Sequence, residues 1–260
     1  VDGADLEAWQ QAVKPNTKLF FCESPANPTL TLVDIVGVAN IANSAGATFV
    51  VDNAFASPAV QNAKTLGADI VVYSATKHID GQGRCLGGAI CCTNDFFKEK
   101  LQPFVRHSGP AMSPFNAWVL AKSLETMSLR VDRMSASAAS LAAALQQMPF
   151  VERVAYPGCP SHPQSELAQR QMKSGGSLLT FKVKGGKSET FAMMNKLNLI
   201  KISNNLGDSK SLITHPATTT HRTLAGEERE ICGITENLLR LSVGLEASID
   251  LITDIEQAGS

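Results

Sequence analysis

Continuous apolar runs alternate with helix-like segments over the first third of the chain. Apolar runs at residues 18–22, 47–51, 69–73 and 87–92 predict strands, and residues 33–44 have apolar positions at helical spacing. Strands that are apolar throughout and joined by helices are typical of a mostly parallel sheet covered on both faces. We therefore predict an α/β fold, with the carboxyl ends of the strands at one edge, where such sheets bind ligands.

The rest of the chain has a different pattern. Residues 114–148 are rich in alanine and leucine and predict two helices, 115–127 and 131–148. Predicted strands follow at 151–155, 177–183, 200–203 and 239–243, with a closing helix at 247–257. We expect three parts: a large domain at 1–113, connecting helices at 114–148 and an α+β C-terminal small domain at 149–260.

Charge and cysteine usage exclude several classes of function. Lysine and arginine total 23 against 24 aspartate and glutamate, a net charge of −1 that argues against a nucleic-acid or anionic-membrane partner. No apolar run is long enough to cross a bilayer. The six cysteines form no C-x-x-C pair, which favours reduced thiols in a cytoplasmic protein, and the five histidines form no ligand cluster, so no metal is expected.

A lysine follows the predicted strand at 69–73. Lys77 comes directly after Ser74 and Thr76, and a lysine at the end of a buried strand tends to neutralise or react. Two hydroxyls beside an amine suit a phosphorylated aldehyde cofactor held by a Schiff base. The alternative is a solvated lysine in a serine- and threonine-rich turn.

Three other polar residues occupy comparable positions. Asp52 follows a buried run and needs a cationic partner, such as a pyridinium nitrogen, unless it caps a helix or lies in a solvated turn. Asn27 lies in a loop stiffened by prolines, where it is either a ligand-binding amide or a turn residue. Arg240, inside an apolar strand, suits a substrate carboxylate or a structural ion pair.

Five segments, taken in order, resemble a known family. They are Glu23 to Pro28, Val51 to Phe55, Ser74 to His78, Leu212 to His221 and Arg240 to Glu246. The chain is similar along nearly its whole length to the pyridoxal-phosphate enzymes of cysteine and methionine metabolism, which include cystathionine γ-synthase, cystathionine lyases, methionine γ-lyase and homoserine-ester sulfhydrylases. Residues 81–88 and 203–208 look most like the sulfhydrylases that use O-succinylhomoserine.

The resemblance implies a role for each candidate residue. Lys77 looks like the Schiff-base lysine, Asp52 like the partner of the ring nitrogen, and Ser74 and Thr76 like phosphate-holding hydroxyls. The residues that resemble the family's substrate-binding positions are Asn27, Asn205 and Arg240. The implied fold is the aspartate-aminotransferase type of pyridoxal-phosphate-dependent transferase, with residues 1–113 as the C-terminal part of the cofactor-binding domain and tetramers built from tight dimers.

The implied reaction is γ-replacement, in which sulfide replaces the acyl group of a homoserine ester and gives homocysteine for methionine biosynthesis. O-acetylhomoserine sulfhydrylase, cystathionine γ-synthase and lyase activities remain alternatives. The family's N-terminal portion, with residues donated across a dimer interface and an aromatic that stacks on the cofactor, is expected to precede Val1. We therefore expect either part of an active enzyme or an inactive fragment that acts only by association.

Overall fold

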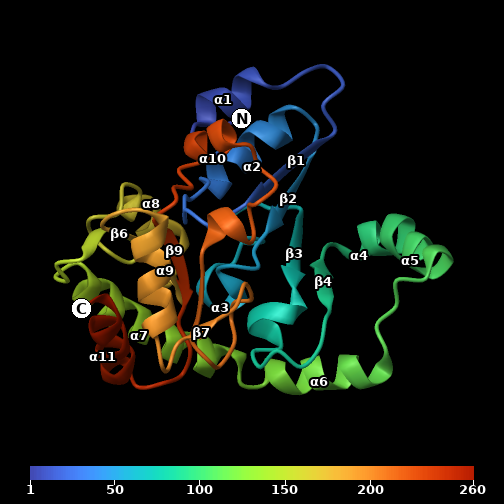
Figure 1. The fold of residues 1–260 in the computed structure, drawn as a ribbon. Helices are drawn as coiled ribbons and strands as arrows, with labels where there is room; N and C mark the ends of the chain where they lie inside the picture. Colours follow the sequence, from blue (N-terminus) through green and yellow to red (C-terminus); the bar gives the residue numbers. More distant parts are fainter.

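Residues 1–260 are all described by the structure, a computed structural model that contains two sheets (Figure 1). The first sheet has four strands in the order β1–β2–β3–β4, with bounds Leu19–Glu23, Thr48–Asp52, Ile70–Ser74 and Gly88–Cys91. Strands β1, β2 and β3 are parallel, and β4 is antiparallel to β3. The predicted, mostly parallel sheet is therefore present, and its parallel strands all end at one edge.

Helix α2 (Ile35–Ser44) covers one face of this sheet, as its spacing of apolar residues predicts. Asp34 caps the helix by accepting a hydrogen bond from the Gly37 amide at 2.9 Å. Its buried positions are Ile35, Val38, Ala39 and Ala42. Two shorter helices, α1 (Leu6–Gln11) and α3 (Ser57–Val60), belong to the same half of the molecule.

The segment after β4 extends away from both sheets (Figure 1). It contains α4 (Asn94–Phe96), the π-helical turn η2 (Phe97–Leu101) and α5 (Gln102–Ser108). The next helices are α6 (Pro114–Leu124) and α7 (Met127–Leu145), so the predicted bounds of 115–127 and 131–148 were wrong. Helix α7 begins earlier because Met127 and Val131 are both buried in an apolar cluster with Leu120 of α6.

The second sheet has the strand order β5–β6–β9–β8–β7. The strand bounds are Val151–Ala155 (β5), Leu178–Val183 (β6), Lys201–Ile202 (β7), Leu212–Thr214 (β8) and Leu238–Ser242 (β9). Strand β8 was not predicted, although its residues belong to one of the five segments quoted above. Side chains of α7, α9 (Lys187–Lys196) and α11 (Ser248–Gly259) pack on one face of this sheet and form the larger apolar core.

Three further short elements connect strands of the second sheet along the chain. They are α8 (Ser165–Gln171), the 3-10 turn η3 (Pro216–Thr218) and α10 (Gly226–Ile231). No helix combines the length and the apolar character needed to cross a membrane. The face of the second sheet that carries Thr180 and Arg240 is opposite the α7 core, and Arg240 bonds from there to the loop after β1.

Candidate active site

A cavity of about 340 Å³ lies where β1, β2 and β3 end. Segments that follow strands of the first sheet and segments of the second sheet both contribute to its wall. The wall is formed by Glu23, Asn27, Asp52, Ala54, Phe55, Ser74, Lys77, Asn204, Leu206, Thr220 and Arg240. The structure thus brings most of the predicted site residues to one place, including Arg240, whose Nη1 bonds a residue 213 positions earlier. A parallel sheet produces this convergence by placing its carboxyl ends at a shared edge.

Lys77 reaches the cavity from a turn of π-helix, η1 (Ala75–Ile79), directly after β3. The backbone of Lys77 leaves helical geometry, with φ −93° and ψ −125°. Its Nζ donates a hydrogen bond of 2.6 Å to Oδ1 of Asn205. Burial, together with the positive charge of Arg240, lowers the pKa of the Lys77 amine. A larger share of Lys77 is therefore the neutral, nucleophilic amine than for an exposed lysine.

Asp52 is the last residue of β2 and has no cationic side chain paired with it. Its Oδ1 accepts a hydrogen bond from the Ala54 amide at 3.0 Å. Burial raises the pKa of the Asp52 carboxyl, and the Ala54 amide only partly opposes this effect. A partly buried carboxylate of this kind suits a cationic partner in the cavity, such as a protonated pyridine nitrogen.

Arg240 is the most deeply buried cation of the site, with 2% of its surface exposed. Nη1 donates to Oδ1 of Asn27 at 2.8 Å, Nη2 donates to the carbonyl of Asn204 at 2.8 Å, and Nε has no partner. Burial lowers the pKa of Arg240 to about 10, an effect that Glu23 opposes. The guanidinium also lies 5.7 Å from the centre of the Phe55 ring. This arrangement leaves a fixed cation on the cavity wall that can pair with a substrate carboxylate.

Two predicted residues make contacts that differ from the expected ones. Ser74 lines the cavity, but Thr76 does not, and Oγ1 of Thr76 accepts a hydrogen bond from the Gly87 amide at 3.2 Å. Asn205 bonds to Lys77 and is not part of the cavity wall. Its amide therefore accepts a hydrogen bond from the lysine, and contact of Asn205 with a substrate stays a prediction.

Glu23 lines the cavity and was missed as a site residue. It ends β1 in register with Asp52 on β2, and it accepts a hydrogen bond from the Asn27 amide at 3.3 Å. Burial, and to a smaller extent the charge of Asp52, raise the pKa of Glu23 to about 7. The signal was available in the sequence, because Glu23 follows an apolar run as Asp52 does.

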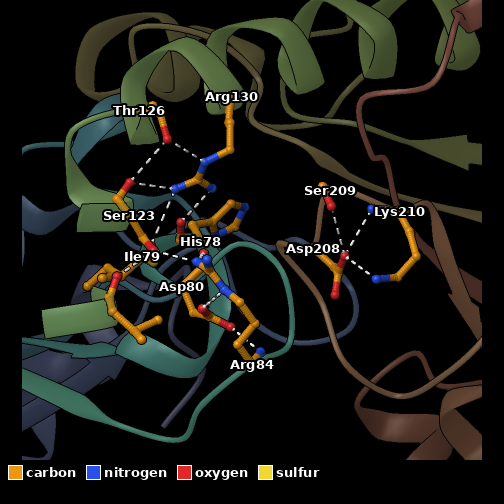
Figure 2. A network of polar contacts seen from close by, with 11 residues as sticks. His78, Ile79, Asp80, Arg84, Ser123, Thr126, Arg130, Asp208, Ser209 and Lys210 are labelled. Carbon is orange, nitrogen blue, oxygen red and sulfur yellow. Dashed lines mark hydrogen bonds and ion pairs between the residues drawn. The ribbon is translucent and has the colours of Figure 1, made fainter. Parts of the chain in front are cut away.

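A polar network that includes Arg130 and Asp80 holds the end of the turn η1, which carries Lys77 (Figure 2). Arg130 of α7 donates to the carbonyls of His78 at 2.9 Å and Ile79 at 3.3 Å. Asp80 is fully buried and pairs with Arg84, whose Nε lies 3.0 Å from Oδ1. The bonds from Arg130 satisfy the carbonyls at the end of the turn, and they therefore hold the backbone that carries Lys77 in place.

The cavity wall has polar groups that suit the amine-reactive carbon, the ring nitrogen and the phosphate of pyridoxal phosphate. It offers an amine at Lys77, a carboxylate without a cationic partner at Asp52, a hydroxyl at Ser74 and a guanidinium at Arg240. The volume of about 340 Å³ is within the usual range of small-molecule sites. The residues present therefore fit this cofactor.

The chain is similar to known proteins over almost its whole length. The chain is 51% identical to O-succinylhomoserine sulfhydrylase of Mycobacterium tuberculosis, over 99% of this chain and 64% of that protein. It is 43% identical to L-methionine gamma-lyase of Pseudomonas putida, over 99% of this chain and 65% of that protein. A solved structure, cystathionine gamma lyase (CalE6) from Micromonospora echinospora, matches 99% of this chain and 68% of its own length, with a TM-score of 0.96 and 37% identity.

These matches confirm the predicted fold, that of the pyridoxal-phosphate-dependent transferases. The chain spans slightly less than two thirds of the curated relatives, 64% and 65% of their length. A family model described as Cys/Met metabolism PLP-dependent enzyme matches residues 1–259. The chain therefore belongs to the Cys/Met metabolism PLP-dependent enzyme family.

Proposed function

We propose that this chain carries the catalytic centre of a pyridoxal-phosphate-dependent sulfhydrylase. In the proposed reaction, O-succinyl-L-homoserine and sulfide give L-homocysteine and succinate. The carbon–oxygen bond at the γ carbon breaks, sulfide forms the new carbon–sulfur bond there, and succinate leaves with the oxygen. The observation that carries the proposal is the convergence of Lys77, Asp52 and Arg240 on one cavity.

Each of these residues has a distinct task in the proposal. Lys77 would hold the cofactor covalently through Nζ, and the free Nζ would move protons at the α and β carbons of the substrate. Asp52 would pair with the ring nitrogen and keep it protonated, and Arg240 would pair with the substrate carboxylate while Asn27 holds the guanidinium in place. When bound, the cofactor supplies an electron-accepting ring that stabilises negative charge on the substrate carbons.

Ser74 lines the cavity and is proposed to donate to the phosphate. Thr76 would do so only if its hydroxyl left the Gly87 backbone, to which it now bonds. A homotetrameric assembly and a cytoplasmic location are also proposed, from the family resemblance and the reduced cysteines.

Cofactor attachment can be tested on the chain itself. Purified protein is mixed with pyridoxal phosphate and reduced with borohydride, and the labelled lysine is identified by peptide mass spectrometry. We expect a stable adduct at Lys77 that Lys77→Ala abolishes and Lys64→Ala leaves unchanged. Labelling spread over several surface lysines, with no preference for Lys77, would overturn the assignment.

Substrate choice requires a second assay. Sulfide is offered with the succinyl, acetyl and phosphoryl esters of homoserine, and homocysteine is measured. The proposal predicts fastest turnover of the succinyl ester. Preference for cysteine over sulfide as acceptor would instead indicate cystathionine γ-synthase, and release of methanethiol from methionine would indicate a lyase, in line with the 43% identity to a methionine γ-lyase.

A further inference from the structure

His78, the residue after Lys77, is buried between the two halves of the molecule. Only 2% of its surface is exposed. Its ring Nδ1 lies 3.1 Å from the carbonyl of Ala54, and Nε2 lies 2.8 Å from Oγ of Ser177. Ala54 follows β2 and donates its amide to Asp52, while Ser177 directly precedes β6 of the second sheet. One side chain thus joins the segments that carry Asp52 and Lys77 to the sheet that carries Arg240.

The hydrogen-bond partners determine the protonation of the ring. A backbone carbonyl only accepts, so Nδ1 carries the proton and donates it to Ala54. Nε2 is then the unprotonated nitrogen, and it accepts from the Ser177 hydroxyl. Burial lowers the pKa of His78 to about 4, and the charges of Arg130 and Lys77 act in the same direction. The ring therefore stays neutral and keeps both bonds at physiological pH.

The backbone around His78 is also held on two sides. Arg130 donates to its carbonyl, as Figure 2 shows, and the loop at Gly207 lies against its amide. A Cβ on Gly207 would be 2.6 Å from the His78 nitrogen, closer than side-chain carbons approach. Gly207 has φ +70° and its amide bonds to Ser242 of β9. Movement of the second sheet would therefore be transmitted to the Lys77–His78 peptide.

We propose that His78 is a positioning residue that, by joining Ala54 to Ser177, fixes the direction in which Lys77 enters the cavity. The proposal deepens the function proposed above and rests on the assignment of Lys77 as the reactive amine. His78 does not touch the cavity and takes no part in proton transfer. Its effect is exerted through the peptide it shares with Lys77 and through the contact of Ala54 with Asp52.

Three substitutions separate the two bonds. His78→Phe keeps the ring volume and removes both bonds. His78→Asn keeps a donor near the Nδ1 position and loses the bond to Ser177, and Ser177→Ala removes the same bond from the other side. His215→Phe is the matched control, because His215 is also buried, 1% exposed, and bonds through both ring nitrogens to Thr218 and the Glu236 carbonyl.

The test measures Lys77 without the cofactor. The chain is methylated with formaldehyde and cyanoborohydride over a range of pH, and peptide mass spectrometry gives the apparent pKa of Lys77 against exposed lysines. In His78→Phe we expect Lys77 to leave its partly buried position and its apparent pKa to rise towards the ordinary value of 10.5. His78→Asn and Ser177→Ala should give smaller, matching rises, and His215→Phe should give none.

Two results would overturn the proposal. One is an unchanged Lys77 profile in folded His78→Phe, and the other is an equal shift in His215→Phe. If His78→Phe does not fold, as judged by circular dichroism, the comparison of His78→Asn with Ser177→Ala decides, because unchanged profiles in both contradict the proposal. Failure of pyridoxal phosphate to label wild-type Lys77 would refute the proposed function instead, and it would leave this measurement intact.

Discussion

The bond between Lys77 and Asn205 gives a quantitative prediction about the reactivity of the lysine. Nζ donates to Oδ1 of Asn205 at 2.6 Å, and this bond is stronger for the charged ammonium than for the neutral amine. Asn205→Ala removes the acceptor and should therefore lower the pKa of Lys77 further. Asn205→Asp places a negative charge at the same distance and should raise it.

The size of the effect follows from the bond. A hydrogen bond to a charged group contributes about 1.5–3 kcal/mol when well buried. Lys77 is only partly buried, so solvent screening reduces this to about 1–1.5 kcal/mol, which corresponds to roughly one pKa unit. At a pH below the pKa, the rate of amine labelling of Lys77 should thus rise about tenfold in Asn205→Ala, and Asn205→Asp should slow it.

The assay is the pH dependence of reductive methylation at Lys77, read by peptide mass spectrometry. Asn204→Ala is the control, because Asn204 is the neighbouring residue of the same type, and its side chain does not bond Lys77. The reasoning would be refuted by equal shifts in the two alanine variants. A rise in the pKa of Lys77 in Asn205→Ala would refute it as well, because the sign would then be wrong.

Three further predictions concern residues around this site and the second sheet. Hydrogen bonds from three backbone amides before β7 outweigh burial and lower the pKa of Asp254. The ionised carboxylate therefore stabilises the folded chain above about pH 3.8, and this contribution is lost below. Asp254→Asn should lower the free energy of unfolding in urea by about 1–2 kcal/mol at pH 7, and the difference from wild type should shrink towards pH 2. Gly207→Ala should destabilise the chain by more than the roughly 1–2 kcal/mol that a positive φ costs a residue with a side chain. Gly46→Ala is the control and should show that backbone cost alone, because Gly46 has φ +62° and no atom within 4 Å of the added carbon. Equal losses of stability in the two variants would contradict the close contact at His78. Arg240→Lys should weaken binding of an amino-acid carboxylate by about tenfold to a hundredfold in calorimetry, because lysine lacks the planar guanidinium that binds both carboxylate oxygens. Thermal unfolding should still show a folded chain. Unchanged affinity would exclude the proposed role of Arg240 in binding the carboxylate.

The positions of Asp52, Lys77 and Glu23 could be predicted from local pattern. Each follows an apolar run, and a parallel sheet brings such positions together whatever their separation in sequence. Glu23 satisfies the same criterion as Asp52, although only Asn27 was predicted as a site residue of that segment. The position of an ionisable side chain after an apolar strand is therefore enough to identify Glu23 together with Asp52 and Lys77.

Thr76 shows where closeness in the sequence fails to predict a shared role. Ser74 and Thr76 were both expected to hold the phosphate, because both hydroxyls lie beside Lys77 in the sequence. The chain turns into a helix directly after Ser74, and residues two apart in a helix point to nearly opposite sides. Thr76 therefore bonds to the Gly87 backbone instead of facing the cavity. Locating that change from strand to helix would have required knowing that Arg130 satisfies the carbonyls at the end of the turn.

The support beneath Lys77 depends on distant residues and on close backbone approach, and neither is visible in local sequence. The segment from Lys77 to Gly81 has the composition of a solvated turn, yet His78 and Asp80 are buried. The His78 ring is satisfied by Ala54 and Ser177, and the Asp80 carboxylate is satisfied by Arg84. Arg130, 52 residues after His78, donates to the His78 carbonyl, and Gly81 leaves room for it because a Cβ there would clash with the Arg130 guanidinium. The partners of His78 and Arg130 thus come from other elements, so the sequence motif around Lys77 specifies the reactive amine but not the geometry that directs it.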